Sequence, residues 1–446
     1  MIDREALRNA VQKECARLGV EDWEIVFSSG TSISAEMVDE ELVEFSSATE
    51  TGISARLVVD GREGVATSQR VDLSIIPDLL ARALENSRVK DVDSSYIPEI
   101  HGPGDAYPEK TCARGYLSSA TEIHDVLART QRTLFSSDGR VSKGTSSSAA
   151  TGSGESYVEN SKGLSLYDSW ASSYVSSSVI VKDGEDVKNA FHAIEGDICK
   201  ADMRPAVDKA LKRLSAGTLA SGPRPVIFNP DCFNMFLSTF SSAFSGKNAL
   251  LGLSPYGDKV GDMVASPCVT LVDDPLYPDY PAQRTFDGDA YATYTKTVIE
   301  DGVLKTLLYN RQWALKAGCR TTGNALSTAA GSAICPYSFY IVPSSSSFDE
   351  LAAKAGEGLY ITAMKGFHAG ADAVSGDFSI ESSGFIISHG KVEGPVQGFT
   401  VAGNFFQMLK DIQAVADDLE FDVTLSSFRT GSPSVLVSGL SIAGKQ

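Results

Sequence analysis

The sequence predicts an α+β protein: an N-terminal region of helices and antiparallel strands, then a C-terminal domain of predominantly antiparallel β-structure. Two patterns predict it. Apolar and polar residues alternate over short runs, as in half-buried strands, and elsewhere apolar residues recur every three or four positions, as on one face of a helix. Asp60-Gly61 and Asp301-Gly302 add the turn residues that are typical of tight hairpins.

A chain of 446 residues is long enough for two or three domains that each bury a core. Gly217 and the run Ser221-Gly222-Pro223 interrupt the periodic pattern, so the main boundary is predicted at residues 216–223. The predicted domains are residues 1–216, with possible sub-units 1–110 and 111–216, and residues 223–446. Both sub-units show a helix followed by strands, but no convincing sequence repeat relates them.

The N-terminal elements follow from the same patterns. They are a helix with its apolar face at residues 6–18, strands within 23–27 and 32–45, a hairpin over 51–68, a helix over 73–84, a connector over 90–114, a helix over 118–135, strands across 139–158 and 164–181, and a helix over 200–214 that Pro205 breaks early. The Ser- and Gly-rich run at residues 145–156 is low in complexity, and its setting predicts strand and turn.

Residues 366–420 carry a compact supersecondary unit. Alternation predicts one strand around Phe378 and Ile380 and another around Phe385 and Ile387, closed by a turn at His389-Gly390. A helix is then predicted to begin at Asn404, which is a good capping residue, and to place five residues on one apolar face: Phe405, Met408, Leu409, Ile412 and Val415. A further strand is predicted over residues 419–425.

Composition narrows the functional classes. The net charge is −18, and no basic stripe is present, so direct binding of nucleic acid is not expected. No apolar run reaches the roughly 18 residues that span a bilayer, and the first 20 residues form a charged amphipathic helix without the apolar core of a signal peptide. Seven scattered cysteines without a CxxC pair favour reduced thiols. These features predict a cytoplasmic protein that does not bind a membrane.

The run GDFSIESSGFIISHGKVEGPVQGFTVAGNFFQMLKDI, residues 376–412, resembles the signature of the TldD/PmbA family, once called modulators of DNA gyrase. The similarity lies in the order of its parts: a Gly-Asp-Phe-Ser strand, a Gly-Phe strand that ends in a Gly-Lys turn, Pro-Val, and Ala-Gly-Asn before a helix. It covers residues 223–446 well and the N-terminal half more loosely. The loop FDGDAY at residues 286–291 departs from the family pattern, which leaves its role open.

The resemblance implies a metallopeptidase family whose catalytic members bind zinc through a His-Glu-x-x-x-His helix and a downstream Cys. Here Leu237, Ser238 and Ser242 stand at the helix positions, and Thr430 stands near the position of the Cys. None of these residues can replace a zinc ligand or a general base. The resemblance therefore points to the metal-free PmbA/TldE-like branch, with no cofactor in this chain and zinc only in a TldD-type partner.

Three functional hypotheses remain open. The first is a non-catalytic subunit that pairs with a TldD-type zinc peptidase, as a hetero-oligomer, and takes part in the proteolysis of unfolded or extended peptides. The second is an autonomous peptidase whose site is unrecognised, and the third is a homodimeric peptide-binding protein.

Four residues are candidates for a peptide groove. Ser375, Gly376 and Asp377 enter their predicted strand with small side chains that would let another backbone approach a sheet edge, and His368 lies in the preceding loop. The pair Asp273-Asp274 is expected to end a strand in a turn rather than to act as a catalytic pair.

Overall fold

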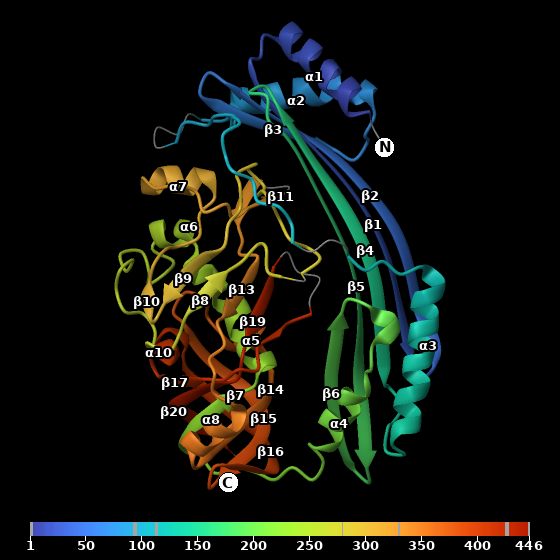
Figure 1. The fold of residues 1–446 in the computed structure, drawn as a ribbon, viewed down its shortest axis with the longest axis vertical. Coiled ribbons are helices and arrows are strands. Elements are labelled where there is room, and N and C mark those ends of the chain that lie inside the picture. The colour runs from blue at the N-terminus through green and yellow to red at the C-terminus, as the bar shows by residue number, and fades with distance from the viewer. Residues whose placement is uncertain are drawn as a thin grey trace.

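The computed structural model describes residues 3–91, 96–111, 115–278, 280–328, 331–423 and 428–444, and they form two parts (Figure 1). The N-terminal part is one long curved sheet with four helices. The C-terminal part begins at β7 and lies beside that sheet. The predicted α+β class is confirmed, because helices and mainly antiparallel sheets occur in both parts.

The first sheet has six strands in the order β3-β2-β1-β4-β5-β6, and all neighbouring pairs are antiparallel. Its strands are β1 (Asp22–Val38), β2 (Glu41–Val59), β3 (Arg62–Ser68), β4 (Ser146–Asn160), β5 (Ser165–Asp183) and β6 (Asp186–Glu195). Its helices are α1 (Arg4–Leu18), α2 (Ile76–Val89), α3 (Ala120–Ser137) and α4 (Arg204–Leu211), with short 3₁₀ turns at Leu73–Ile75 and Ile198–Lys200.

This sheet is made of two units of the same topology. Each unit is a helix, three antiparallel strands and a second helix, and the units join where β1 pairs with β4 from Glu24 opposite Asn160 to Val38 opposite Ser146. The strand order is therefore symmetric about the β1–β4 pair. The sequence shows no repeat here, because hydrophobic alternation can be met by many residues and leaves little identity between equivalent strands.

The two faces of the sheet differ in character. On β1, Trp23 and Ile25 pack under α1 and α2, whereas Ala35 and Met37 pack under α3 and α4. Val26 points the other way and packs near Phe286 of the C-terminal part. All four helices thus cover one face, which we call the outer face, and the inner face is left for the C-terminal part.

The C-terminal part holds two six-stranded sheets, in the orders β10-β9-β8-β13-β19-β18 and β16-β15-β14-β7-β20-β17, with one parallel pair in each. The strands are β7 (Gly222–Phe228), β8 (Leu271–Asp273), β9 (Lys296–Glu300), β10 (Val303–Leu304), β11 (Ala325–Thr328), β12 (Gly331–Ile334), β13 (Ser338–Ile341), β14 (Gly358–Lys365), β15 (Asp377–Ser388), β16 (Lys391–Asn404), β17 (Ile412–Val415), β18 (Glu420–Phe421), β19 (Arg429–Ser432) and β20 (Val435–Ala443). The helices are α5 (Pro230–Phe240), α6 (Gly246–Leu250), α7 (Arg311–Ala317), α8 (Phe348–Ala355), α9 (Phe367–Gly370) and α10 (Phe405–Lys410), with a 3₁₀ turn at Ser241–Phe244 after α5.

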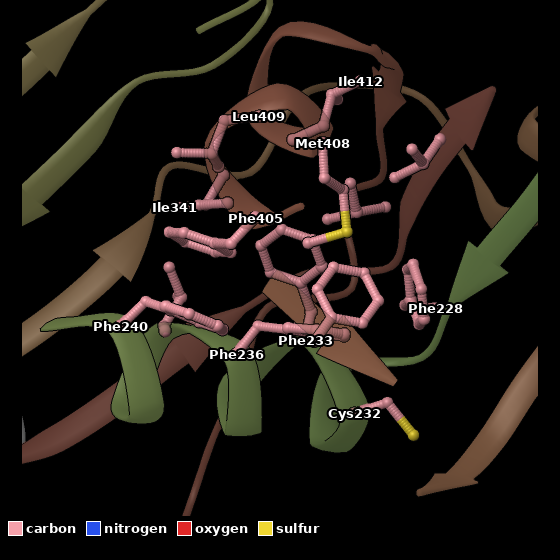
Figure 2. Close-up of a cluster of buried hydrophobic side chains, with 14 of the residues drawn as sticks. Phe228, Cys232, Phe233, Phe236, Phe240, Ile341, Phe405, Met408, Leu409 and Ile412 are labelled. Atoms are coloured by element: carbon pink, nitrogen blue, oxygen red, sulfur yellow. The ribbon is translucent and has the colours of Figure 1, made fainter. Parts of the chain in front are cut away.

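One phenylalanine-rich core joins both sheets to α5 (Figure 2). The Phe236 ring meets those of Phe367 and Phe378 edge-on at centroid distances of 4.9 and 4.8 Å, and Phe240 stacks on Phe405 at 4.5 Å. Such pairs stabilise a core beyond their buried area. In the described part of the chain, no helix is long and apolar enough to cross a membrane.

The predicted helix over residues 404–415 is wrong in its second half. Asn404 does cap a helix, but α10 ends at Lys410, and β17 (Ile412–Val415) pairs with β20. A register shift between Ile412 and Ala414 lets Ile412 and Val415 both face the core from a strand. The bulge therefore produces a helical spacing of buried residues without a helix.

Three other predicted elements differ in extent. The two strands predicted around Phe378 and Phe385 are one strand, β15, which carries bulges. Of the strand predicted over residues 419–425, only Glu420–Phe421 is a strand, and residues 424–427 lie outside the described chain. Pro205 stands in the first turn of α4 and does not break the helix, since an N–H has no helical partner there. Of the low-complexity run, predicted as strand and turn, residues 146–156 belong to strand β4.

Candidate functional site

A cleft made of three adjoining hollows runs between the inner face of the first sheet and the C-terminal part. The α5 hollow, of about 520 Å³, lies between β6, α5 and β14. The Trp170 hollow, of about 330 Å³, lies between the middle of the sheet and a wall that includes Tyr280 and Tyr337. The β2 hollow, of about 740 Å³, follows β1, β2 and β4. Val423 lines the first two hollows, and Trp170 and Arg284 line the last two, so each hollow adjoins the next along the cleft.

Helix α5 separates the core from the α5 hollow. Its cap, Asn229, accepts a hydrogen bond from the Cys232 N–H at 2.9 Å, and Pro230 takes the first helical position. Residues at three- and four-residue spacing point into the core (Figure 2): Phe233, Phe236 and Phe240. The other face presents Met235, Ser238 and Thr239 to the hollow.

The structure brings the four predicted zinc-site positions near one another. Leu237 and Ser238 lie on α5, and Ser242 lies in the 3₁₀ turn that follows it. Thr430 of β19 packs against the same helix, where its Oγ1 donates a hydrogen bond to the Asn234 carbonyl at 3.2 Å. Only Ser238 faces the cleft, because Leu237 and Thr430 are fully buried and Ser242 lies outside the hollow's lining.

These residues do not fit a zinc ion. Zinc in proteins takes His, Cys or carboxylate ligands, whereas Leu237 offers no donor atom and the Thr430 hydroxyl is engaged with the backbone of α5. Across the described ranges, no group of three or more His, Cys, Asp and Glu residues is arranged to hold a metal.

Ionisable groups surround the α5 hollow, and burial shifts the pKa values of some of them. Burial raises the pKa of Asp422 to about 6, although its Oδ1 accepts a hydrogen bond from the Thr430 N–H at 2.7 Å. Burial also lowers the pKa of His192 on β6, and nearby Lys209 lowers it further. Arg213 spans the cleft at this end, because it donates hydrogen bonds to the Asn189 carbonyl of β6 at 2.9 Å and to the Thr362 carbonyl of β14 at 2.8 Å.

The Trp170 hollow has a floor of small residues and walls of large rings. The floor is formed by side chains of β1 and β4 that point away from the helices: Ser32, Ser34, Ala150 and Gly152. The walls are Trp170 and Tyr174 from β5 and Tyr280 and Tyr337 from the C-terminal part. Both parts of the molecule are thus needed to complete this hollow.

Glycines on β4 allow Trp170 to lie flat on the sheet. A Cβ at Gly154 would stand 2.5 Å from the Trp170 ring nitrogen, and a Cβ at Gly152 would stand 3.3 Å from the ring edge. The low-complexity run of β4 is therefore the surface on which this ring lies.

The four residues predicted to form a peptide groove, Ser375, Gly376, Asp377 and His368, lie outside the three hollows of the cleft. The Gly376 N–H donates a hydrogen bond to the Asp372 carbonyl at 2.9 Å, and its carbonyl accepts one from the Phe405 N–H at 2.7 Å. At the start of β15, Asp377 pairs with Asn404 of β16 on one side, and on the other side its carbonyl accepts a hydrogen bond from the Asp372 N–H at 2.9 Å. The expected free sheet edge at residues 375–377 is therefore covered by the segment at residues 371–372. His368 is exposed on α9, and none of the four residues lines the three hollows. Their role in peptide binding stays a prediction.

The pair Asp273-Asp274 has two structural roles. Asp274 closes a turn, because its Oδ1 accepts a hydrogen bond from the Leu276 N–H at 2.9 Å, as predicted. Asp273 is buried, and its Oδ2 accepts hydrogen bonds from Lys296 Nζ at 3.0 Å and Asn324 Nδ2 at 2.7 Å.

The loop at residues 286–291 joins the two parts of the molecule. Both Asp287 oxygens accept backbone hydrogen bonds, and burial raises the pKa of Asp287 to about 8. Asp289 is partly buried, which raises its pKa, and the charge of Arg56 on β2 partly offsets this rise. Arg56 in turn pairs with Glu24 at 3.0 Å. The sequence left the role of this loop open, and the structure shows that one of its roles is to contact the first sheet.

Sequence reasoning missed the residues of the Trp170 hollow. Its four rings and the charged pair Glu195 and Arg284 come from three distant segments, and no local motif marks them. The only sequence signal for this hollow was the run of Ser and Gly at alternate positions of β1 and β4. It indicates that the inner face of these strands carries small side chains.

Comparisons with known proteins agree with this architecture. Three family models match the chain: the PmbA/TldA metallopeptidase domain 1 at residues 23–87, the central domain at residues 117–214 and the C-terminal domain at residues 221–444.

Full-length relatives show the same similarity. The chain is 25% identical to the metalloprotease PmbA of Escherichia coli O157:H7, over 99% of this chain and 96% of that protein. It is 26% identical to the metalloprotease PmbA homolog of Haemophilus influenzae, over 93% of this chain and 90% of that protein.

Two crystal structures share the fold. A protein from Thermotoga maritima MSB8, described as a candidate modulator of a DNA gyrase, superimposes with a TM-score of 0.89 at 25% identity, over 99% of this chain and 100% of the other. TldE from Thermococcus kodakarensis superimposes with a TM-score of 0.88 over 98% of this chain and 100% of the other, and at 21% identity it shows the fold alone. The chain belongs to the PmbA/TldD metallopeptidase family, on its PmbA-like branch.

Proposed function

We propose that this chain is the metal-free subunit of a PmbA/TldD-type peptidase, that it binds extended peptides in its cleft, and that a TldD-type zinc subunit cleaves them. The observation that carries the proposal is the face of α5. It lies on the cleft of a metallopeptidase fold, yet it presents Ser238 where the family resemblance places a carboxylate in catalytic members.

The cleft has the character of a peptide-binding site. Its floor is the inner face of a long sheet with small polar side chains, so an extended chain can lie against it without meeting bulky residues. Its other wall supplies aromatic rings and charged groups that can hold side chains in place. What this chain contributes is binding and orientation, and the cleavage of the peptide bond is assigned to the partner subunit.

The proposal includes a cytoplasmic location and a hetero-oligomer. Six cysteines in the described chain are free thiols, and burial raises the pKa of the Cys15 thiol to about 12, which keeps this thiol protonated and unreactive. An autonomous peptidase would need a nucleophile or a metal that the α5 face does not offer, and a homodimeric binding protein would need no zinc-bearing partner.

A direct test measures binding and cleavage with the same labelled, unstructured peptide. The purified chain should bind the peptide in fluorescence anisotropy without cleaving it, and cleavage should require the TldD-type protein from the same genome. Ser238→Trp, which fills the α5 hollow, should weaken binding about tenfold or more. Ser136→Trp, at an exposed site on α3 behind the sheet, is the matched control.

Two results would contradict the proposal. Cleavage by this chain alone that follows the protein through purification would support an autonomous peptidase. Equal peptide binding by the Ser238→Trp and wild-type proteins would remove the α5 hollow from the peptide path.

A further inference from the structure

The Trp170 hollow differs from the rest of the cleft because four aromatic rings converge on it. Two come from β5 of the first sheet, and two come from the C-terminal part. Arg429 packs on the Tyr280 ring at 3.6 Å from its centroid, and Lys296 Nζ lies 5.6 Å from the centroid of the Tyr337 ring. The Tyr337 N–H also donates a hydrogen bond to Asp273 at 2.6 Å, which fixes the backbone that carries this ring. A preformed aromatic wall of this kind favours a flat, apolar guest.

The floor gives the hollow its depth. Ser34 and Ala150 are directly opposite each other on β1 and β4, and Ser32 is opposite Gly152. These small side chains leave a space of about 330 Å³ above the sheet, which is enough for one large side chain.

The charges beside the hollow balance. The Glu195 carboxylate accepts a hydrogen bond from the Ser172 hydroxyl at 2.6 Å. In the described chain, the Arg284 guanidinium has no hydrogen-bonded or ion-paired side chain, and it lines both the Trp170 and the β2 hollows. One anion and one cation thus face the same space, so the attraction of a charged side chain to one of them would be offset by repulsion from the other, and the pair favours neither sign of charge.

Building on the proposed function, we propose that the Trp170 hollow is a specificity pocket that receives one neutral aromatic side chain of the bound peptide. Phe or Tyr would lie between the ring of Trp170 and the tyrosines of the opposite wall, while the peptide backbone continues into the neighbouring hollows. Burial raises the pKa of Tyr280 to about 12, so this wall stays uncharged at neutral pH.

The test uses four labelled 11-residue peptides that are identical except for a central Phe, Ala, Lys or Glu. With the full-length chain, the Phe peptide should bind about tenfold to a hundredfold more tightly than the Ala peptide, and the Lys and Glu peptides should bind no better than the Ala peptide. Ser34→Trp fills the hollow and should abolish the preference for Phe, whereas Ser136→Trp should keep it.

A charge swap gives a second readout that does not depend on filling the floor. Arg284→Glu leaves two carboxylates beside the hollow and should raise the affinity for the Lys peptide relative to the Glu peptide by about tenfold. Arg132→Glu on the exposed side of α3 has the same effect on net charge and should leave the ratio unchanged.

The outcomes separate the pocket from the proposed function. If the four peptides bind the wild-type chain equally, and Ser238→Trp still weakens the binding of all four, the proposed specificity pocket is refuted while peptide binding in the cleft is supported. A wild-type preference for Lys or Glu would also overturn the pocket. If none of the peptides binds, both the pocket and the proposed function fail.

Discussion

Lys296 and Asp273 form an ion pair that is almost completely removed from water, with the two side chains 3% and 0% exposed. Asn324 bridges them, because its Nδ2 donates a hydrogen bond to Asp273 and its Oδ1 accepts one from Lys296. The Tyr337 backbone is tied to the same carboxylate. At the scale of single residues, this network fixes one wall of the cleft, and each member depends on the others, since a buried charge without its partner is costly.

Removing the cation should therefore destabilise the fold strongly. Lys296→Met should lower the free energy of unfolding by about 3–5 kcal/mol, because it leaves Asp273 buried and uncompensated. Urea denaturation measures the change. Lys305→Met is the matched control: its pair with Glu300 is about half exposed, and its loss should cost about 1 kcal/mol or less. Equal effects of the two variants would contradict the importance of the buried network.

The raised pKa of Asp422 predicts a loss of stability as pH increases. Its carboxyl has a pKa of about 6 in the folded state against 3.8 for the unperturbed group. Between about pH 4 and pH 6 the unfolded chain releases this proton while the folded chain keeps it, so the folded state loses stability over this range. Below pH 4 both states are protonated, and above pH 6 the loss is constant.

Asp422→Asn should remove this dependence. Relative to wild type, the variant should gain about 1–2 kcal/mol in unfolding free energy between pH 4.5 and pH 7, because its amide keeps an acceptor for the Thr430 N–H without a buried charge. Urea titrations at the two pH values measure the difference. Asp208→Asn, an exposed residue on α4, should show none. If the difference in unfolding free energy between Asp422→Asn and wild type does not change with pH, the raised pKa of Asp422 is refuted.

At the scale of elements, β4 and β5 show how a sheet is shaped to hold a large ring. Gly30 of β1 and Gly154 of β4 are directly opposite each other, but only Gly154 lies under Trp170. A Cβ at Gly30 would meet just the Ser153 carbonyl at 3.4 Å. The two positions are alike in sequence and strand geometry and differ in what lies above them.

This difference predicts unequal effects of one substitution. Gly154→Val should displace Trp170, lower the free energy of unfolding by about 1–3 kcal/mol and weaken binding of the Phe peptide. Gly30→Val should change stability by less, because a β-branched residue suits a strand and finds space there. Tryptophan fluorescence and urea denaturation check the two variants. A Gly154→Val protein as stable as wild type, with unchanged fluorescence, would show that the ring does not lie on this glycine.

At the scale of the whole molecule, the first sheet and the C-terminal part meet at the cleft. The first sheet is symmetric and has its helices on the outer face, so its inner face must be covered by the C-terminal part or left to bind a ligand. The loop at residues 286–291 and Arg213 join the two parts at separate places along the cleft. These contacts link the two walls of the cleft at both places.

The chemistry of the α5 face predicts little metal binding by the intact chain. After mild dialysis, elemental analysis should find far less than one zinc per chain, because Leu237, Ser238, Ser242 and Thr430 provide no ligand set for the ion. A stoichiometric metal would contradict this expectation. Substitutions at His368 or at the cysteines would then locate the ligands.

The sequence alone determined the fold class, the family resemblance and most individual elements, because these depend on local signals. Alternation defined the strands of the 51–68 hairpin, Asn404 capped a helix as expected, and the Gly-Asp-Phe-Ser to Ala-Gly-Asn order identified the family. It also predicted that the residues at the four zinc positions would not bind the ion, since that expectation follows from residue type.

The tertiary structure decided what long-range contacts control. The bulge that places Ile412 and Val415 in a strand depends on pairing with β20. The edge beside Gly376 is covered by β16 and by the segment at residues 371–372. The Trp170 hollow combines rings from residues more than 150 positions apart, such as Trp170 and Tyr337. These residues belong to the two different parts of the molecule. Local periodicity encodes which face of an element is buried, but it does not encode which other element covers that face. The cleft depends on how elements from the two parts pack against each other, so the sequence pattern could not predict it.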